Sequence, residues 1–455
     1  MSKAELEKTP LEDWRTEYAQ RLRDEIAADW CVKNVGDICS IRTGKLDVNQ
    51  ADEDGAYPFF TCAEKVYRIN TPAFDAEAVL LAGNGDFNVK YYKGKFNPYQ
   101  RTYVLSDLQV DGKYLYYYIS YRLRDLTGDS RGSTIKYIRL GDVRDYPVPV
   151  APLVQQKRIV AEIEKQFSRL DEAVANLKRI KANLKRYKAA VLKAAVEGRL
   201  VETEAERARR EGRSYETGAQ LLQRILETRR NQWQGKGKYK ETAAPDTTAL
   251  PKLPEGWVWA SLGSLIVDGP QNGLYLPKSL YGSGHPILRI DDYQQDWMRP
   301  ITELQRVRAK PEDVVTYSLR SGDIVINRVN SPSHLGKVAV WAIEAEMPLF
   351  ESNMMRAALS SGVVPLYVAT YLRSLHGRAR LTKQAKWAVN QASINQQDVC
   401  GTQVPLPSLA EQNRIVAEVE LRISVLRETE AQVDANFRRT DRLRQSILSH
   451  AFASQ

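Results

Sequence analysis

The sequence predicts an α+β protein in which two α/β modules are separated and followed by long helices that pair inside one chain. Two duplications indicate this order. RIVAEI at 158–163 returns as RIVAEV at 414–419, and the offset of 256 residues holds without a gap over about fifty positions. DWCVKNVGDI from Asp29 and EGWVWASLGSL from Glu255 open the two modules. A chain of 455 residues is also too long for one ordinary core.

The first 28 residues (1–28) are predicted to form an amphipathic helix that packs on another part of the chain. The segment MSKAELEKTPLEDW is polar, unlike a signal peptide, and no apolar run approaches the roughly 20 residues of a membrane span. The four cysteines form no CxxC pair, which favours free thiols in a cytoplasmic protein. The apolar positions at helical spacing are Leu11, Trp14, Tyr18, Leu22 and Ile26.

The modules, residues 29–150 and 255–404, are predicted to mix short strands with helices. EAVLLAG at 77–83 and GDIVINRV at 322–329 are typical of strands bounded by polar or glycine turns. LYYYISYRL and LYVATYLRSL are typical of helices. The two modules have like frames and unlike interiors. In the closing frames, Ile138, Asp142 and Val143 match Ile394, Asp398 and Val399 at the 256-residue offset.

Each module is followed by a long predicted helix. The first lies in residues 151–254, which also hold a linker, and the second lies in residues 405–455. Pro152 and Pro407 precede the two periodic runs, and proline is well suited to a helix start. At about 1.5 Å per residue, a run of about 45 residues would be roughly 65–70 Å long.

The apolar positions of the two long helices predict that the helices pair with each other. In the first copy these positions recur in steps of three, four and seven, which is a heptad seam. Lys181 interrupts this seam where the second copy has Phe437, and Glu430 interrupts the second seam where the first copy has Val174. Each helix has an apolar residue at the seam position where the other has a charged one. This pattern favours pairing of the two helices within one chain over self-association of each copy.

Excess positive charge lies on the first long helix and the linker. Residues 151–250 hold 22 Lys and Arg against 13 Asp and Glu, whereas residues 29–150 hold 16 of each. The net charge of +10 favours a polyanionic partner, with nucleic acid ahead of a membrane surface. Either DNA runs along this region or a partner with acidic patches docks there. The linker itself predicts one helix, SYETGAQLLQRILETRRNQW, and then a flexible stretch.

Catalytic motifs are missing from the sequence. It has no GxxxxGK[ST] phosphate loop, no dinucleotide-binding glycine turn and no HExxH zinc pattern. Asn97-Pro98-Tyr99 lacks the second proline of the Asn/Asp-Pro-Pro-aromatic motif of amino methyltransferases, which favours a turn. Asp291-Asp292 is more typical of solvated loop carboxylates than of a metal site. We therefore assign no catalytic residue, metal site or cofactor to this chain.

Basic and polar loops in the modules are candidates for DNA contact. KYYKGKF at 90–96 interleaves lysines, which neutralise phosphates, with tyrosines, which pack on sugars or bases. NRVNSPSHLGK at 327–337 includes side chains that bond to guanine and adenine edges, although a solvated hairpin tip would use the same residues. The candidate DNA-binding residues are Lys45, Asn49, Lys90, Tyr91, Lys93, Lys95, Arg101, Thr134, Lys136, Gln271, Asn272, Lys278, Arg289, Arg328, Asn330, Ser331, His334, Lys337, Asn390 and Gln391.

Several framing segments resemble those of a known family. PVPVAPLVQQKRIVAEIE and VPLPSLAEQNRIVAEVE resemble the segments that open the two conserved helical regions of type I restriction–modification DNA specificity subunits. KRYKAAVLKAAVEGRL, WQGKGKYKE and LPKLPEGWVWASLG are similar to the passage from the central region into the second recognition domain. The resemblance covers essentially the whole chain.

The resemblance implies a DNA-reading subunit that is not itself an enzyme. Residues 29–150 and 255–404 would be target recognition domains, each reading one half of a split site in double-stranded DNA. The two helical regions would pair as an antiparallel coiled coil and hold the domains at a fixed distance. Two methyltransferase (modification) subunits and a restriction/translocase subunit would assemble on this framework. S-adenosylmethionine, ATP and magnesium would bind in those partners, with no membrane involved.

Two other classes of function remain open from the residues alone. An interaction scaffold would use the coiled coil to organise proteins and the modules to bind peptides, and it would be indifferent to DNA in a shift assay with the methyltransferase present. A self-contained methyltransferase or nuclease would show activity in the isolated chain. The missing motifs argue against the enzyme.

Overall fold

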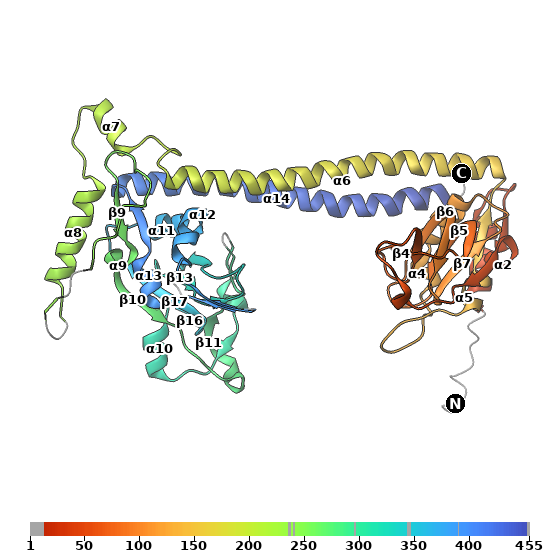
Figure 1. The fold of residues 1–455 in the computed structure, drawn as a ribbon, viewed down its shortest axis with the longest axis horizontal. Helices are drawn as coiled ribbons and strands as arrows, with labels where there is room; N and C mark the ends of the chain where they lie inside the picture. Colours follow the sequence, from red (N-terminus) through yellow and green to blue (C-terminus); the bar gives the residue numbers. More distant parts are fainter. Residues whose placement is uncertain are drawn as a thin grey trace. The chain divides into compact units, whose positions relative to one another are not determined.

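The protein is described by a computed structural model, in which the chain divides into two compact units. The first unit is Met1–Arg179 with Val433–Gln455, and the second is Ile180–Gln432. Each unit thus holds one α/β domain and part of both long helices (Figure 1). The residues described are 13–234, 238–239, 242–294, 297–343, 347–389 and 391–452.

The first domain is built on a six-stranded sheet with the order β2-β7-β5-β6-β3-β4. Its neighbouring strands are antiparallel except β3 and β6, which are parallel. Helix α3 packs on β5 and β6, and the Asp111 carboxylate caps its first turn. The elements are β1 Cys31–Asn34, α2 Val35–Ile38, β2 Ser40–Thr43, η1 Val48–Gln50, β3 Tyr57–Phe60, β4 Tyr67–Ile69, β5 Phe74–Ala82, β6 Val89–Pro98, β7 Thr102–Ser106, α3 Gly112–Tyr121, α4 Leu123–Leu126, α5 Leu140–Arg144 and β8 Pro147–Val150.

The second domain carries a four-stranded sheet, β10-β17-β13-β15, and two three-stranded sheets, β12-β11-β16 and β14-β19-β18. Helix α11 packs beside β15, and its tyrosines Tyr367 and Tyr371 enter the core. The elements are β9 Val258–Ser261, α9 Leu262–Leu265, β10 Ile266–Asn272, η2 Lys278–Leu280, β11 Tyr281–Leu288, η3 Ile301–Glu303, β12 Arg306–Val307, α10 Pro311–Tyr317, β13 Ile324–Asn327, β14 Val329–Asn330, β15 Val338–Val340, β16 Leu349–Phe350, β17 Met354–Leu359, α11 Pro365–Arg373, α12 Leu375–Leu381, β18 Lys386–Ala388, β19 Gln391–Ser393, α13 Gln396–Gly401 and β20 Gln403–Leu406.

The duplicated frames pair with each other and close each domain. Strand β1 is antiparallel to β8, with Asn34 opposite Pro147, and β9 is antiparallel to β20, with Ser261 opposite Gln403. Each first strand leads into a one-turn helix, α2 or α9, which lies against α5 or α13. The repeated letters at both ends of each module therefore encode one local structure, whatever the interior contains.

The two long helices, α6 (Leu153–Val196) and α14 (Leu409–Phe452), have 44 residues each. In the first unit Ile163 shares a core with Leu448 and Phe452, and the Arg444 guanidinium bonds to Asp171. Residue numbers therefore rise along α6 in the direction in which they fall along α14, so the two helices are antiparallel. This arrangement confirms the predicted pairing within one chain and its antiparallel direction.

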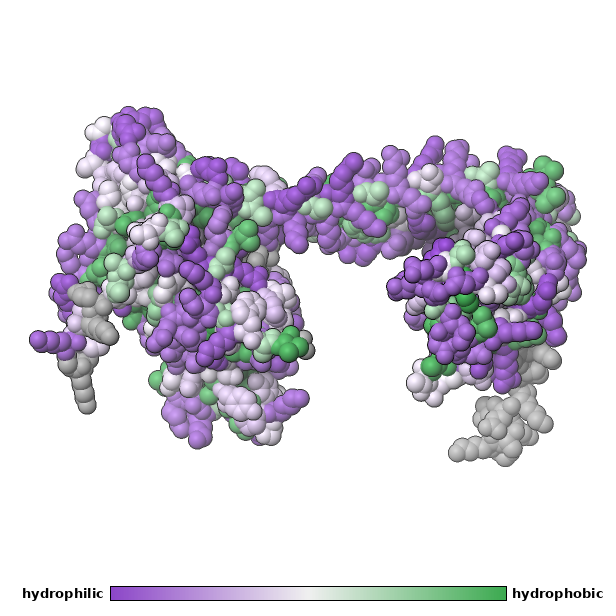
Figure 2. Space-filling model, in the orientation of Figure 1, coloured by the Kyte–Doolittle hydropathy of each residue, from purple (hydrophilic) through white to green (hydrophobic). Residues whose placement is uncertain are grey.

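The second unit shows the same antiparallel pairing. Val191 and Leu192 of α6 share a core with Ile415 and Val419 of α14, and Arg422 donates a 3.5 Å bond to the Tyr187 hydroxyl. The burial follows the heptad positions, as expected for a coiled coil. Figure 2 shows mostly hydrophilic residues along the visible outer side of the long helices.

A buried glutamine joins each long helix to its domain. The Gln156 amide donates to Ala151 O (2.7 Å) and its carbonyl accepts from the Asp111 amide (2.7 Å), just before α3. At the 256-residue offset, Gln412 donates to Pro407 O (3.1 Å) and accepts from the Val364 amide (2.8 Å), just before α11. The two glutamines are 2% and 0% exposed. The long helices are therefore anchored to their domains by paired polar groups as well as by apolar packing.

Replacing Gln412 with alanine should destabilise the second unit. The substitution leaves the Val364 amide and the Pro407 carbonyl without their partner inside the protein, which should cost about 2–4 kcal/mol. Urea or thermal unfolding followed by circular dichroism measures this loss. Gln223→Ala on the exposed face of α8 is the matched control and should change stability by less than about 0.5 kcal/mol. Equal stability of the two variants would contradict the anchoring role.

The N-terminal helix and the linker helix occupy similar places in the two units. Helix α1 (Asp13–Glu25) packs beside β1 and β8 and buries Tyr18 and Leu22, so the predicted amphipathic helix has its partner in the first domain. Helix α8 (Gly218–Asn231), expected in the linker, packs beside β9 and β20 and buries Leu221 and Ile225. The predicted position Leu11 lies outside the described residues.

Two local expectations need revision. KYYKGKF was expected to be a loop, but it lies in strand β6, where it pairs with β5 over its whole length. Period-two strands and polar loops share lysines and tyrosines, so composition alone misassigned it. The linker also holds a second helix, α7 (Glu204–Glu211), which its high charge and short length concealed.

Candidate nucleic-acid interface

In the first domain, hydrogen bonds gather several predicted residues around the turn between β5 and β6. The Gly83 amide donates to Arg101 O and the Gly85 amide donates to Lys136 O, both at 2.8 Å. Thr134 lies in the same exposed hairpin as Lys136. The side chains of Arg101, Thr134 and Lys136 are exposed, so they are available to a ligand at this surface.

Lys90 and Tyr91, at the start of β6, are engaged inside the protein. The Lys90 ammonium donates to Ala63 O (2.8 Å) and to the Asn88 carbonyl, and burial lowers its pKa. The Tyr91 hydroxyl donates to Glu77 Oε1 (3.0 Å), and burial together with this carboxylate raises its pKa to about 12. These two side chains would have to exchange existing bonds to contact DNA.

Lys93 and Lys95 lie farther along β6, two residues apart and therefore on one face of the strand. Both are exposed, and Lys93 pairs with Glu77 at 3.2 Å, whereas Lys95 lies opposite Asp75 in the strand register. An exposed ion pair such as Lys93–Glu77 contributes little stability, so the Lys93 ammonium can turn to a phosphate at small cost.

Lys45 lines a groove of about 920 Å³ in the first domain, and Asn49 lies exposed in the adjoining turn η1. The loop that contains Lys45 and Leu46 lies beside Arg101, because the amide of the preceding Gln100 donates to Leu46 O at 2.9 Å. Arg42 also lines the groove, with its guanidinium 5.4 Å from the Phe74 ring centre. Arg42 was missed from the sequence, where nothing links it to a phenylalanine 32 residues later.

In the second domain, the start of β17 brings two predicted segments together. Asn272 at the end of β10 lies opposite Met355, and Asn327 at the end of β13 lies opposite Met354. Gln271 is held between the Arg356 guanidinium (3.1 Å) and Thr316 O (3.1 Å). Asn272 is exposed at the end of its strand.

The loop after β13 presents four more predicted residues. Arg328 donates to Ser352 O (3.2 Å), and the Asn330 carbonyl accepts from the Ser331 amide (2.7 Å). The Ser331 hydroxyl lies 3.0 Å from His334 Nδ1, and His334 is exposed. These contacts shape the loop while leaving donors and acceptors at its surface.

Strand β19 joins this loop to another predicted segment. Asn330 lies opposite Ala392 in the β14–β19 pair, so Gln391 is next to the loop. Asn390 lies outside the described residues. The neighbouring strand β18 exposes Trp387 at 61%, so its ring is available beside this loop. Trp387 was missed because a single aromatic residue in KWAVNQAS gives no sign of exposure.

Lys337, Arg289 and Lys278 differ in availability. The Lys337 ammonium is buried, donates to Ile290 O (2.6 Å) and lies 4.6 Å from the Tyr293 ring centre, and burial lowers its pKa. Arg289 bonds to Glu351 (3.4 Å) and to the Gln305 carbonyl (3.1 Å). Lys278 is exposed in η2. Among the described residues, Lys337 and Arg289 must break these bonds to contact a ligand, whereas Lys278 can offer its charge directly.

The described parts of the chain contain neither a candidate metal cluster nor a candidate membrane span. Across those residues, no group of three or more His, Cys, Asp or Glu side chains is placed to hold a metal ion. Nor does any helix among them combine the length and the apolar character needed to cross a bilayer. What the two domains offer is exposed hydrogen-bonding groups and individual basic side chains, which suit contacts with phosphates and base edges.

Comparison with known proteins agrees with these features. The family model for the type I restriction modification DNA specificity domain matches residues 27–186. The type I restriction enzyme EcoDI specificity subunit of Escherichia coli is 30% identical over 440 residues, which is 95% of this chain and 89% of that protein. The StySPI specificity subunit of Salmonella potsdam is 27% identical over 330 residues, covering 72% of this chain and 61% of its own length.

A solved structure shares the fold. One chain, from work on the complex assembly and conformational transition of the type I R-M system, aligns with a TM-score of 0.59 at 17% identity. The alignment covers 94% of this chain and 99% of that chain. The shared architecture therefore extends over both domains and both long helices.

Proposed function

Because the chain belongs to the type I restriction–modification DNA specificity subunits, we propose that it reads a two-part DNA target with one recognition domain for each half-site. The observation that carries the proposal is the duplication of a closed frame, β1 with β8 and β9 with β20, around two unlike interiors. Two different readers in one polypeptide suit a target with two different halves.

The proposed reading divides between charge and hydrogen bonding. Exposed Lys95, Arg101 and Lys136 in the first domain would hold phosphates, which fixes the position of the domain on the duplex. Asn330 and His334 in the second domain would contact base edges, which carry sequence identity. The paired helices α6 and α14 would set the unread gap between the half-sites.

The chemistry would belong to partner subunits. We assign no catalytic residue to this chain, which would scaffold two methyltransferase subunits and a restriction/translocase subunit. S-adenosylmethionine, ATP and magnesium would bind in those partners. The four cysteines are free thiols, which suits the reducing cytoplasm in which such a complex would act.

The salt dependence of DNA binding tests the phosphate contacts. In the complex with the methyltransferase subunits, affinity should fall steeply with salt. Arg101→Ala combined with Lys136→Ala should reduce the slope of log affinity against log salt by about 1.8, at about 0.9 per lost phosphate contact. Fluorescence anisotropy with a labelled target duplex measures the slope.

The control exchanges two exposed lysines outside this surface. Lys33→Ala combined with Lys157→Ala removes the same charge from β1 and α6. Long-range attraction alone would make both pairs equivalent, whereas direct contact predicts an effect of the first pair only. Equal slopes for the two double variants would remove Arg101 and Lys136 from the interface.

A further inference from the structure

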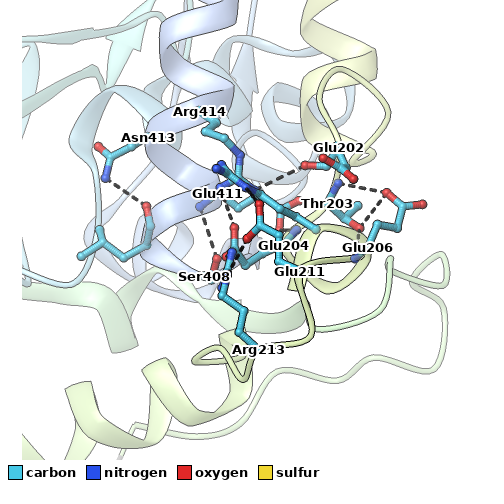
Figure 3. Close-up of polar contacts among 12 residues, drawn as sticks. Glu202, Thr203, Glu204, Glu206, Glu211, Arg213, Ser408, Glu411, Asn413 and Arg414 are labelled. Carbon is cyan, nitrogen blue, oxygen red and sulfur yellow. Dashed lines mark hydrogen bonds and ion pairs between the residues drawn. The ribbon is translucent and has the colours of Figure 1, made fainter. Parts of the chain in front are cut away.

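In the second unit, the linker docks on the start of the long helix α14. The Glu411 carboxylate accepts the Glu204 amide at the N-terminus of α7 at 3.0 Å (Figure 3). It also accepts the Trp257 indole N–H at 3.0 Å. Glu411 is buried, and this burial raises the pKa of its carboxyl. The first turn of α7 is therefore held by an acceptor that lies beneath it.

The Glu204 side chain completes this docking. Its carboxylate accepts one bond from Arg414 and one from Arg213, each at 2.5 Å (Figure 3). Burial alone would raise the pKa of Glu204, but the two guanidinium groups hold it below its ordinary value. Leu200 and Val201, just before α7, pack against the apolar core. A glutamate at a helix start thus docks through one amide, one carboxylate and apolar neighbours.

The first unit repeats the receiving side of this contact. At the 256-residue offset, Gln155 stands where Glu411 is and Arg158 stands where Arg414 is. The Trp30 indole donates to Gln155 Oε1 at 2.8 Å, just as Trp257 donates to Glu411. The guanidinium and the indole are therefore present in the first unit, and Gln155 Oε1 is an acceptor there. The Gln155 amide nitrogen, which replaces the Glu411 Oε2 that receives the Glu204 amide, donates instead to Asp29.

Among the described residues, the corresponding place in the first unit is open. Trp30, Gln155, Arg158 and Ile159 line an open pocket of about 630 Å³, whereas the counterpart of Ile159, Ile415, is fully buried. Among the described residues, no hydrogen bond or ion pair is found for the exposed Arg158 side chain. Apolar surface also remains open at the start of α6, with Leu153 53% and Val154 80% exposed.

We infer that this pocket is a docking site for a partner protein segment that carries a glutamate in the first turn of a helix. The partner's helix-start amide would donate to Gln155 Oε1, its carboxylate would bond to Arg158, and an apolar residue before the helix would cover Ile159. The inference rests on the internal duplication and does not depend on DNA reading.

The chemistry of the pocket favours a peptide over a DNA phosphate. A phosphate has no donor for Gln155 Oε1, whereas a helix start offers both an amide donor and a carboxylate. Asp29 and Glu162 line the pocket together with Arg158 and Lys165, so the lining carries no net positive charge to attract a polyanion. The second unit binds Glu204 although Glu411 lies beside it, so a single carboxylate paired with guanidinium is tolerated there.

The first test uses the segment that fills the second unit as a probe. A fluorescent peptide of residues 199–213 should bind the full chain saturably in an anisotropy titration. Arg158→Ala should weaken binding at least about tenfold, because charge-assisted bonds are strong. A peptide that carries Glu204→Gln should bind the unchanged chain more weakly by a similar factor. Lys157→Ala, an exposed neighbour outside the pocket, should leave binding unchanged.

A second measurement removes the dependence on peptide affinity, since a short free peptide is only weakly helical. Residues 200–213 are appended after Gln455, which the 256-residue offset places opposite Arg199. Tethering raises the effective concentration of the segment. Hydrogen exchange should then slow in residues 153–162, and Arg158→Ala should restore the original rate.

The outcomes separate the possible occupants. Peptide binding and exchange protection that both ignore Arg158→Ala would overturn the inference, as would the absence of both. If neither peptide form binds while Arg158→Ala weakens duplex DNA binding tenfold, the pocket receives a phosphate and the inference is wrong. If the full chain bound the peptide as expected but showed no sequence-specific DNA binding with its partners, that result would count against the proposed function alone.

Discussion

Exchanging residues 29–150 for the first recognition domain of another specificity subunit should change one half of the DNA motif and leave the other half unaltered. The physical reason is that β1 and β8, the first and last strands of the domain, pair along their full lengths. The two ends of the exchanged segment therefore lie side by side. Its core lies within the first unit, so the exchange need not disturb the second domain. Methylation-sensitive long-read sequencing of cells that carry the partners measures both halves.

The reciprocal exchange is the matched control. Replacing residues 255–404, which β9 and β20 enclose in the same way, should change the other half of the motif. Swaps that retain Gln156 and Gln412 keep the anchors between domain and helix. If either exchange altered both halves, the domains would not act as independent readers and the modular proposal would fail.

Inserting one heptad into only one long helix should abolish assembly and modification. An insertion between Arg179 and Ile180 lengthens α6 by about 10.5 Å, so the antiparallel seam can no longer match on both sides of it. The seam residues in each unit, such as Ile163 with Leu448 and Val191 with Val419, would lose their mutual register. Purification with the methyltransferase subunit and methylation of cellular DNA measure the loss.

A matched second insertion should restore assembly with a different gap. A heptad between Gln432 and Val433 of α14 faces the first insertion at the point where the two units divide. Both seams then keep their partners, and the unread gap should lengthen by about three base pairs, at about 3.4 Å each. A doubly inserted chain that methylates the original motif with unchanged spacing would refute the idea that the helices set the gap.

Much of the fold could be predicted because duplication and periodicity are properties of the linear sequence. The 256-residue offset predicted like frames, and the complementary lapses at Lys181 and Glu430 predicted helices that pair within the chain. Helix α8 followed from its apolar spacing. Helix α7 did not, because its eight residues, six of them charged, show little apolar periodicity and look like a solvated linker until Glu411 and Arg414 are brought beneath them.

The candidate site was harder to predict, because availability depends on contacts between distant residues. Lys95 and Lys337 are both lysines in predicted DNA-contact segments and cannot be told apart from the sequence. In the structure Lys95 is exposed on β6, whereas Lys337 is buried against Tyr293. Arg42 and Trp387 gave no signal, since their exposure and neighbours come from strand pairing. The roles of the twenty nominated residues in DNA contact stay predictions.

The sequence by itself determined the order of domains and helices, their duplication and the intramolecular partner of each long helix. These features follow from residue identity and spacing, which set local backbone preference and apolar faces. Only the tertiary structure decided that a linker glutamate fills one of two corresponding sites, whereas the other, at Arg158, is an open pocket among the described residues. That difference depends on which segments fold back onto the helix starts, and such long-range contacts leave no periodic trace in the chain.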